Sequence, residues 1–271
     1  MIRITIVTGA SGNHFACLGN LLDSIEVNES DTRTIVYDLG LDAVQVRELA
    51  GGRWEIRKFA FDDYPAYCRI DDSQRYTGFH IDKGRHSGCY AWKPIIISDI
   101  LEEVGGAVLW LDAGNLVHRP LAGIRSTLAA QGIYAPVSQG TIQRWMHPKT
   151  LAYLEVPPGH LVNTNRNAAV LGFAPGRPGI LELVREWRRC ALDESCIAPT
   201  GADHSNHRWD QALLSALVYQ FQERYGYELA DDLLDVSIHN DRLSREEARM
   251  AVRLEADVLH RIAKGKTSRF R

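Results

Sequence analysis

The chain of 271 residues has few cysteines, no long apolar run and no large excess of charge of either sign. Its five cysteines form no Cys-x-x-Cys pair and no zinc-ligand spacing, so we expect neither a zinc site nor a disulfide framework. The net charge of −3 gives no reason to expect nucleic acid as a partner. No apolar run is long enough to cross a bilayer, and the first residues are typical of a strand rather than of a cleaved leader. We therefore expect a reduced, cytoplasmic protein without a transmembrane segment.

The chain instead contains alternating short β-branched runs and amphipathic stretches. Its contents of 45% hydrophobic and 24% charged residues are typical of a globular protein. Strands are predicted over residues 2–7, 34–37, 54–59, 107–111, 133–137, 167–173 and 235–238, with a further candidate over 257–262. Helices are predicted over residues 15–25, 42–49, 94–104, 124–131, 179–192 and 209–225. Because no linker or repeat interrupts this order, we predict one α/β domain over residues 1–271, with a mixed, mostly parallel central sheet flanked by helices.

The most informative segment is the apolar run from Val108 to Leu111, which ends on Asp112 and continues into Ala113 and Gly114. Such a run predicts a buried central strand. Ligands of open α/β sheets bind at the carboxyl ends of the strands, so Asp112 lies where a substrate or metal is expected. The alternative is that Asp112 only caps the following turn.

The first strand and its turn leave a second interpretation open. The segment from Thr8 to Gly12 is similar to the glycine-rich turn of a dinucleotide-binding unit, and Asp38 fits the acid that holds a ribose. However, Phe15 stands where the third glycine is required. Tyr90 and Lys93 are also one residue too close for the Tyr-x-x-x-Lys pair of short-chain dehydrogenases. An NAD(P)-dependent short-chain oxidoreductase is therefore retained as the less favoured alternative.

The order of motifs along the whole chain resembles that of the GT-A glycosyltransferases, in particular the retaining, metal-dependent enzymes with an Asp-x-Asp motif. Asp112 matches the first acid of that motif, and Gly114 replaces the second. The resemblance implies a GT-A-like, Rossmann-like domain that transfers a sugar from a nucleotide-diphosphate donor, a UDP-sugar by preference, to the hydroxyl of a glycan or small-molecule acceptor. It implies a donor part over about residues 1–120 and an acceptor part over 121–271.

The same resemblance assigns the site residues. Those that match nucleotide-sugar contacts are Thr8, Gly9, Ala10, Asp38, Lys93, Asp112, Ala113, Gly114, Asn167, Lys264 and Lys266. Acceptor contacts are expected from His207, Trp209 and Asp210, because Trp209-Asp210-Gln211 is similar to the family's Asp-Gln helix start. Asp210 and Lys93 are the expected catalytic side chains. The plainer alternatives are that Asp210 is a helix N-terminal acid and that Trp209 belongs to the core.

A Mn²⁺ or Mg²⁺ ion is also implied, held by Asp112 and by His260 in a segment that resembles the family's closing His-x-x-Gly-x-Lys motif. The missing second acid leaves three hypotheses. Another group, with Asn115, Asp210 or His239 as candidates, completes the metal site, or the lysines at 93, 264 and 266 neutralise the diphosphate alone, or the chain is a non-catalytic nucleotide-sugar-binding relative. The basic residues 264–271 are a candidate for peripheral membrane contact. The sequence does not decide between a retaining and an inverting reaction.

Overall fold

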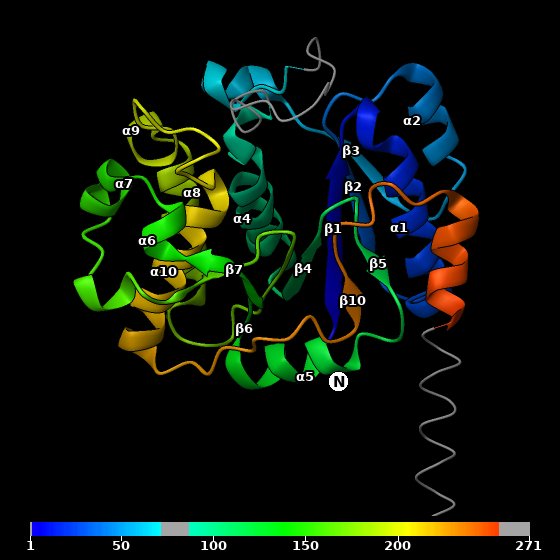
Figure 1. Ribbon diagram of the computed structural model, residues 1–271. Coiled ribbons are helices and arrows are strands. Elements are labelled where there is room, and N and C mark those ends of the chain that lie inside the picture. Colours follow the sequence, from blue (N-terminus) through cyan, green and yellow to red (C-terminus); the bar gives the residue numbers. More distant parts are fainter. Residues whose placement is uncertain (1, 72–86, 255–271) are drawn as a thin grey trace, which may run out of the picture.

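A computed structural model describes residues 2–71 and 87–254 of the chain. Its centre is a six-stranded sheet in the order β3-β2-β1-β4-β9-β6 (Figure 1). The strands are β1 (Ile4–Ala10), β2 (Thr34–Asp38), β3 (Glu55–Lys58), β4 (Ala107–Leu111), β6 (Ile133–Tyr134) and β9 (Val170–Phe173). Strands β1 to β4 are parallel, whereas β9 is antiparallel to both β4 and β6. The predicted mixed, mostly parallel sheet is therefore confirmed.

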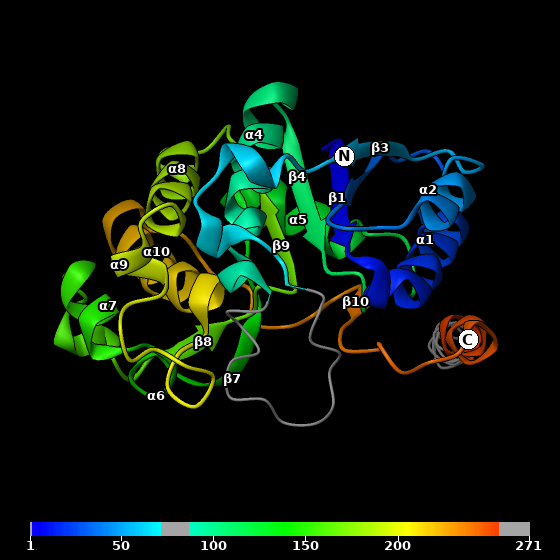
Figure 2. The same ribbon diagram turned by 90° about the horizontal axis from the view of Figure 1, so that it is seen from above.

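Helices cover both faces of this sheet (Figure 2). One face packs against α1 (Phe15–Asn28) and α5 (Ala122–Gln131), and the other packs against α4 (Trp92–Val104), α8 (Ile180–Ala191) and α10 (Trp209–Tyr225). The side chains of β4 alternate between these two cores, with Val108 and Trp110 in one and Leu109 and Leu111 in the other. Burial on both faces explains why this strand is a continuous apolar run rather than an alternating one.

Several helix boundaries follow from local chemistry that the sequence made visible. Asp42 begins α2 (Ala43–Leu49) with a capping box, in which its carboxylate accepts from the backbone of Gln45 and the Gln45 side chain accepts in return. Helices α4 and α5 end at Gly105 and Gly132, whose φ angles of 59° and 76° lie in the left-handed region that favours glycine. The ends predicted for these three helices, at residues 49, 104 and 131, are confirmed.

Two small sheets and several short helices complete the described fold. Strand β5 (Leu116–Val117) pairs antiparallel with β10 (Val236–Ser237), and β7 (Val137–Thr141) pairs antiparallel with β8 (Thr164–Arg166). The prediction of one strand over 133–137 was wrong, since β6 and β7 belong to different sheets. The short helices α6 (Ile142–Trp145), α7 (Pro148–Tyr153) and α9 (Glu194–Ile197) were not predicted, because one or two turns show no apolar period. The candidate strand over 257–262 lies outside the described residues.

The remaining helical segments are short 3₁₀ turns and the end of the described chain. The 3₁₀ turns are Gly12–His14, Phe61–Asp63, Ala66–Cys68, Gly88–Tyr90 and Pro158–His160. Residues 245–254 are helical. All five cysteines are buried and free. Within 2–71 and 87–254, no helix combines the length and the apolarity that a membrane span requires.

Candidate active site

Lys93 lies at the centre of a buried charge network that joins three parts of the fold. It is in the first turn of α4, and its side chain is only 3% exposed. Its Nζ is 2.9 Å from Oδ1 of Asp112 and 3.4 Å from Oδ2 of Asp210, and it donates to the backbone oxygen of Ala168 at 2.9 Å. We call Lys93, Asp112 and Asp210 the buried triad. A buried ammonium is tolerated only when it is paired and hydrogen-bonded, and three oxygens meet that condition here.

Three aromatic rings surround the same ammonium group. The centroids of Tyr90, Trp92 and Trp110 lie 5.7, 5.8 and 5.7 Å from Lys93 Nζ. The negative ring faces add cation–π attraction, which strengthens when the cation is desolvated. Burial alone would lower the pKa of Lys93, but the two carboxylates outweigh burial and raise the pKa above its ordinary value. Lys93 is therefore a fixed positive charge.

Asp112 follows β4 directly, as the sequence predicted, and it connects the triad to solvent. Its Oδ1 accepts from Trp110 Nε1 at 2.6 Å in addition to its contact with Lys93. Its side chain remains 37% exposed. Among the described residues, these two donors both use Oδ1.

Asp210 is the buried acid of the triad, in the first turn of α10. Its Oδ2 faces Lys93 at ion-pair distance but makes no hydrogen bond with the described residues. Burial raises the pKa of Asp210 from 3.8 to about 6, because the opposing attraction of Lys93 is partly offset by the negative charge of Asp112. A desolvated carboxyl with a perturbed pKa and an unsatisfied oxygen is typical of a functional group.

The backbone is strained on both sides of this network. Cys89 and Tyr90, just before α4, have φ angles of 51° and 54°, and Trp209, just before Asp210, has a φ angle of 40°. Residues other than glycine in this region cost about 1–3 kcal/mol each, and such residues concentrate at functional sites. The strain therefore falls on the two segments that position Lys93 and Asp210.

A second carboxylate occupies the space beside Gly114, where the family motif has its second acid. A Cβ atom at Gly114 would lie 2.2 Å from Oδ1 of Asp241. The segment is held there because β10 pairs with β5 and because the Asn240 amide donates to the Gly114 oxygen at 2.7 Å. Asp241 was missed in the sequence, since no local pattern connects it with a motif more than a hundred residues earlier.

The residues predicted to bind the sugar donor, at the ends of β1 and β2, differ in their burial and hydrogen bonding. Thr8 is fully buried, and its hydroxyl has no partner among the described residues. At Gly9, a Cβ would lie 3.1 Å from the Leu39 side chain, so glycine allows the two strand ends to approach. Ala10 is buried, and the carboxylate of Asp38 accepts from the backbone of Gly40 and Leu41 at 2.8 and 2.7 Å.

Asn167 shapes the turn that completes the network. Its Oδ1 accepts from the Ala169 amide at 2.7 Å. This turn presents the Ala168 oxygen to Lys93, and the Ala169 oxygen accepts from the Asp112 amide at 2.8 Å and from Asn115 Nδ2 at 2.7 Å. Asn167 therefore positions the triad through the backbone. Ala113 is buried.

The structure buries all three residues expected at the acceptor, and Asp210 is described above. His207 is fully buried, its Nδ1 accepts from the His147 amide at 3.1 Å, and its Nε2 lies 2.9 Å from the Ile197 oxygen. Burial lowers the pKa of His207 to about 4, so it is neutral at physiological pH. Trp209 is 1% exposed and packs against the rings of His204 and His207. Both side chains therefore anchor the segment that carries Asp210.

The remaining predictions concern the metal and the basic segment. His260, Lys264 and Lys266 lie outside the described residues. His239 stands in the turn after β10 with a φ angle of 61°. In the part of the chain that the structure describes, no three His, Cys, Asp or Glu side chains converge as a set that could hold a metal ion.

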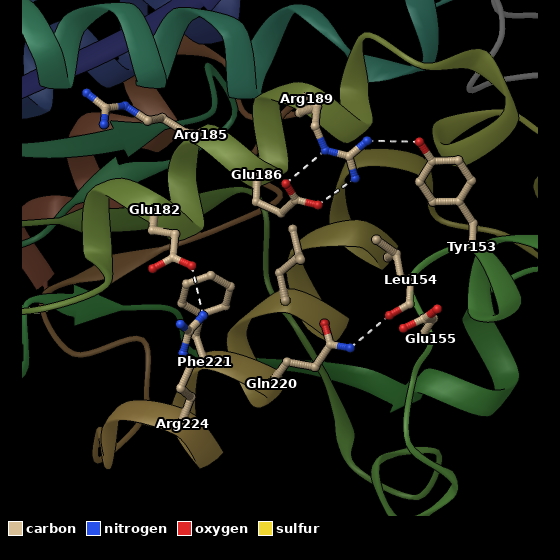
Figure 3. Close-up of a pocket in the computed structure, with 11 residues that line it drawn as sticks. Tyr153, Leu154, Glu155, Glu182, Arg185, Glu186, Arg189, Gln220, Phe221 and Arg224 are labelled. Atoms are coloured by element: carbon tan, nitrogen blue, oxygen red, sulfur yellow. Dashed lines mark hydrogen bonds and ion pairs between the residues drawn. The ribbon is translucent and has the colours of Figure 1, made fainter.

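A cavity of about 580 Å³ lies apart from the triad, between α8 and α10 (Figure 3). Two arginine–glutamate pairs line it, Arg189 with Glu186 at 2.5 Å and Arg224 with Glu182 at 2.8 Å. These pairs are exposed, and such pairs stabilise a protein by only about 0–1 kcal/mol. None of the predicted site residues lines this cavity.

The arrangement of the sheet is shared with solved glycosyltransferase structures. Galactosyltransferase LgtC in complex with donor and acceptor sugar analogues matches with a TM-score of 0.52 and 18% identity, over 93% of this chain and 94% of that chain. An active-site mutant of LgtC matches with a TM-score of 0.50 and 19% identity, over 79% and 69%. The bifunctional glycosyltransferase WbbM, in its apo form, matches with a TM-score of 0.50 and 13% identity, over 86% of this chain and 39% of that chain.

No family model matches the sequence, and no curated protein matches it. At such low identities the structural likeness establishes the fold alone. The antiparallel strand β9 beside β4 also departs from the all-parallel sheet of a dinucleotide-binding domain. The chain therefore has the GT-A fold of these glycosyltransferases.

Proposed function

We propose that this chain transfers a sugar from a nucleotide-diphosphate donor, a UDP-sugar by preference, to an acceptor hydroxyl. The observation that carries this proposal is the buried triad at the carboxyl end of β4. It brings an exposed carboxylate, a fixed cation and a buried acid of raised pKa to the edge of the sheet where ligands of such folds bind.

Lys93 acts in this scheme by positioning the two acids. Its Nζ is buried and already engaged by Asp112, Asp210 and the Ala168 oxygen, so it has little capacity for a direct phosphate contact. It holds Asp112 through Oδ1, and its charge keeps Asp210 largely ionised at neutral pH despite burial.

Asp210 is the proposed group that meets the reacting centre. A pKa of about 6 is close to the operating pH, which suits a base that accepts the proton of the attacking hydroxyl. In an inverting reaction Asp210 takes that proton. In a retaining reaction it instead faces the positive charge that develops at the anomeric carbon. The anomeric configuration of the product, read by NMR, separates these two courses.

The residues beside the triad fit a divalent cation that arrives with the donor. Mg²⁺ is commonly bound by one or two carboxylates together with substrate phosphates rather than by a complete protein cage. Asp112 and, in the space beside Gly114, Asp241 are the carboxylates offered here. When bound, the ion supplies positive charge against which the diphosphate departs. His260 is retained as a third proposed ligand.

The first test is binding and turnover of UDP-sugars by the whole chain. We expect UDP to raise the apparent unfolding free energy by about 2.7 kcal/mol at a hundredfold excess over its Kd, and more strongly with Mn²⁺ than without. UDP should be released from a UDP-sugar in the presence of acceptor. An Asp112→Asn variant that keeps nucleotide affinity but loses turnover would support the proposal.

Two other results would favour a different function for this chain. Tight UDP binding without any release of UDP from a panel of UDP-sugars would favour the non-catalytic binding relative suggested by Gly114. Stabilisation by NADH or NADPH, with none by UDP, would contradict the transferase and favour the oxidoreductase.

A further inference from the structure

Two arginines share one tryptophan ring beside the entrance to α10. The Cζ atoms of Arg144 and Arg208 lie 4.0 and 3.6 Å from the ring centroid of Trp145. We call these three residues the arginine–tryptophan cluster. The two positive charges are thus held within roughly 8 Å of each other, which is about one Debye length at physiological ionic strength, so they repel each other.

The cluster is built by two segments that are distant in the sequence. The Arg208 amide donates to the Trp145 oxygen at 3.1 Å, and Arg144 donates through Nη1 to the Ser205 oxygen at 2.6 Å. Arg208 donates through Nη1 to the His204 oxygen. Each guanidinium is therefore fixed by backbone oxygens, which position it without neutralising its charge.

Neither guanidinium has a carboxylate partner within the described ranges. Two arginines elsewhere in the fold do have one: Arg125 reaches Glu29 at 2.5 Å, and Arg166 reaches Asp231 at 2.8 Å. Burial, reinforced by the charge of Arg144, lowers the pKa of Arg208 below its ordinary value. A half-buried cation next to a like charge costs free energy that a bound anion would recover.

The cluster borders the buried triad. Arg208 is the N-cap residue of α10, and Asp210 lies in the first turn of the same helix. A ligand on the cluster therefore lies next to the acid that we assign to the acceptor hydroxyl. An arginine fork matches the planar, bidentate geometry of phosphate and carboxylate.

We propose that the arginine–tryptophan cluster binds an anionic group, a phosphate or a carboxylate, carried by the acceptor. This inference rests on the proposed transferase function and specifies its acceptor class. The acceptor of this chain is then a phosphorylated or acidic glycan rather than a neutral one.

The test compares Arg208→Gln and Arg144→Gln with the wild type and with Arg185→Gln. Arg185 is an exposed arginine that pairs with Glu102 and lies outside the triad and the cluster, so it controls for the loss of one positive charge. Binding of inorganic phosphate, galactose 6-phosphate and glucuronate is measured by calorimetry with UDP present, so that the donor site is filled. We expect each cluster variant to weaken anion binding at least tenfold, and Arg185→Gln to leave it unchanged.

Three controls keep the outcomes distinct. Arg144 is exposed, so Arg144→Gln remains informative if Arg208→Gln fails to fold. Affinity for UDP alone reports the donor site, and it should be equal in all variants.

Anion affinities equal to the wild type in both cluster variants, or no anion binding by the wild type, would overturn the inference even if UDP binds. Loss of UDP binding in the wild type would instead contradict the proposed function itself. Phosphate should be bound more tightly than glucuronate if the ligand is a phosphate, and less tightly if it is a carboxylate.

Discussion

Two of the places where charged side chains gather in this protein, the cavity between α8 and α10 and the buried triad, differ in how the charge is balanced. In the cavity between α8 and α10, arginines and glutamates pair across exposed helix surfaces (Figure 3). In the buried triad, one buried lysine faces a half-exposed carboxylate and a buried one, and an oxygen of the buried carboxylate has no hydrogen bond among the described residues.

The comparison contrasts charges that solvent screens with charges that burial isolates. The exposed pairs satisfy one another, and water screens them, so they demand no ligand. The triad concentrates burial, a raised pKa and nearby backbone strain in one place, at the sheet edge where ligands bind. The following variants test this contrast, from the largest expected effect to the smallest.

Replacing Lys93 with Met should have the largest effect. It leaves two carboxylates near each other without their cation, and breaking a buried ion pair in this way costs about 3–5 kcal/mol. The loss should be greater at pH 8 than at pH 5, because the pKa of Asp210 rises further once Lys93 is gone. Urea unfolding at both pH values measures it. Equal stability of Lys93→Met and wild type would show that the triad is not a coupled unit.

Replacing Asp210 with Asn should abolish turnover while sparing stability at neutral pH. Because the folded pKa of Asp210 is raised from 3.8 to about 6, the folded state binds this proton more tightly than the unfolded state does. The contribution of Asp210 to stability is therefore present below pH 4 and lost as the pH rises through 6. The difference amounts to about 3 kcal/mol at most.

The measurement is the unfolding free energy of wild type and Asp210→Asn between pH 4 and pH 8. The wild type should lose stability relative to the variant as the pH rises. A difference that stays constant over this range would contradict the raised pKa. Full turnover by Asp210→Asn would remove Asp210 from the proposed mechanism.

Restoring the family motif with Gly114→Asp should lower the stability of the protein rather than raise it. The new carboxylate would meet that of Asp241, and we expect a loss of about 1–2 kcal/mol from like-charge repulsion and displacement. Gly114→Ala should cost less, because the end of the exposed Asp241 side chain can move. Adding Asp241→Gly to Gly114→Asp should recover the stability and also Mn²⁺ affinity, measured by calorimetry. Failure of the double variant to recover either would show that the two acids are not interchangeable.

Replacing Arg224 with Gln, in the cavity between α8 and α10, should have the smallest effect. Its pair with Glu182 is exposed, so we expect a change below about 1 kcal/mol in stability and no change in kcat/KM. A large loss of turnover in this variant would show that the comparison between the two charged regions is wrong.

Most of the fold could be predicted from the sequence because its signals are local. The apolar run of β4, the cap at Asp42 and the glycine stops at Gly105 and Gly132 depend on a few neighbouring residues. The split between β6 and β7 was not visible, since it depends on which sheet each strand joins. The short helices α6 and α7 were missed because their length hides any period.

The site was only partly predictable, because the contacts that assemble it join residues far apart in the sequence. Asp112 could be placed from its strand, and Asp210 from the start of its helix. The contacts that join them through Lys93 are long-range, as are the Ala168 oxygen and the approach of Asp241 to Gly114. No spacing in the sequence encodes these distances. The expected roles of His207 and Trp209 neglected burial, which only tertiary packing reveals.

The buried cysteines have a practical consequence for studying this protein. Only a thiolate reacts readily with labelling reagents, and burial together with the charge of Asp241 raises the pKa of Cys17 to about 12. Cys89 is buried just before α4. Modification of either thiol therefore requires a local opening, which makes its rate a measure of that opening. No cysteine has to be introduced for this purpose. Labelling of Cys17 reports on the surroundings of Gly114, and labelling of Cys89 reports on the segment before Lys93, so mass spectrometry of the modified peptides can follow both sides of the site in one experiment.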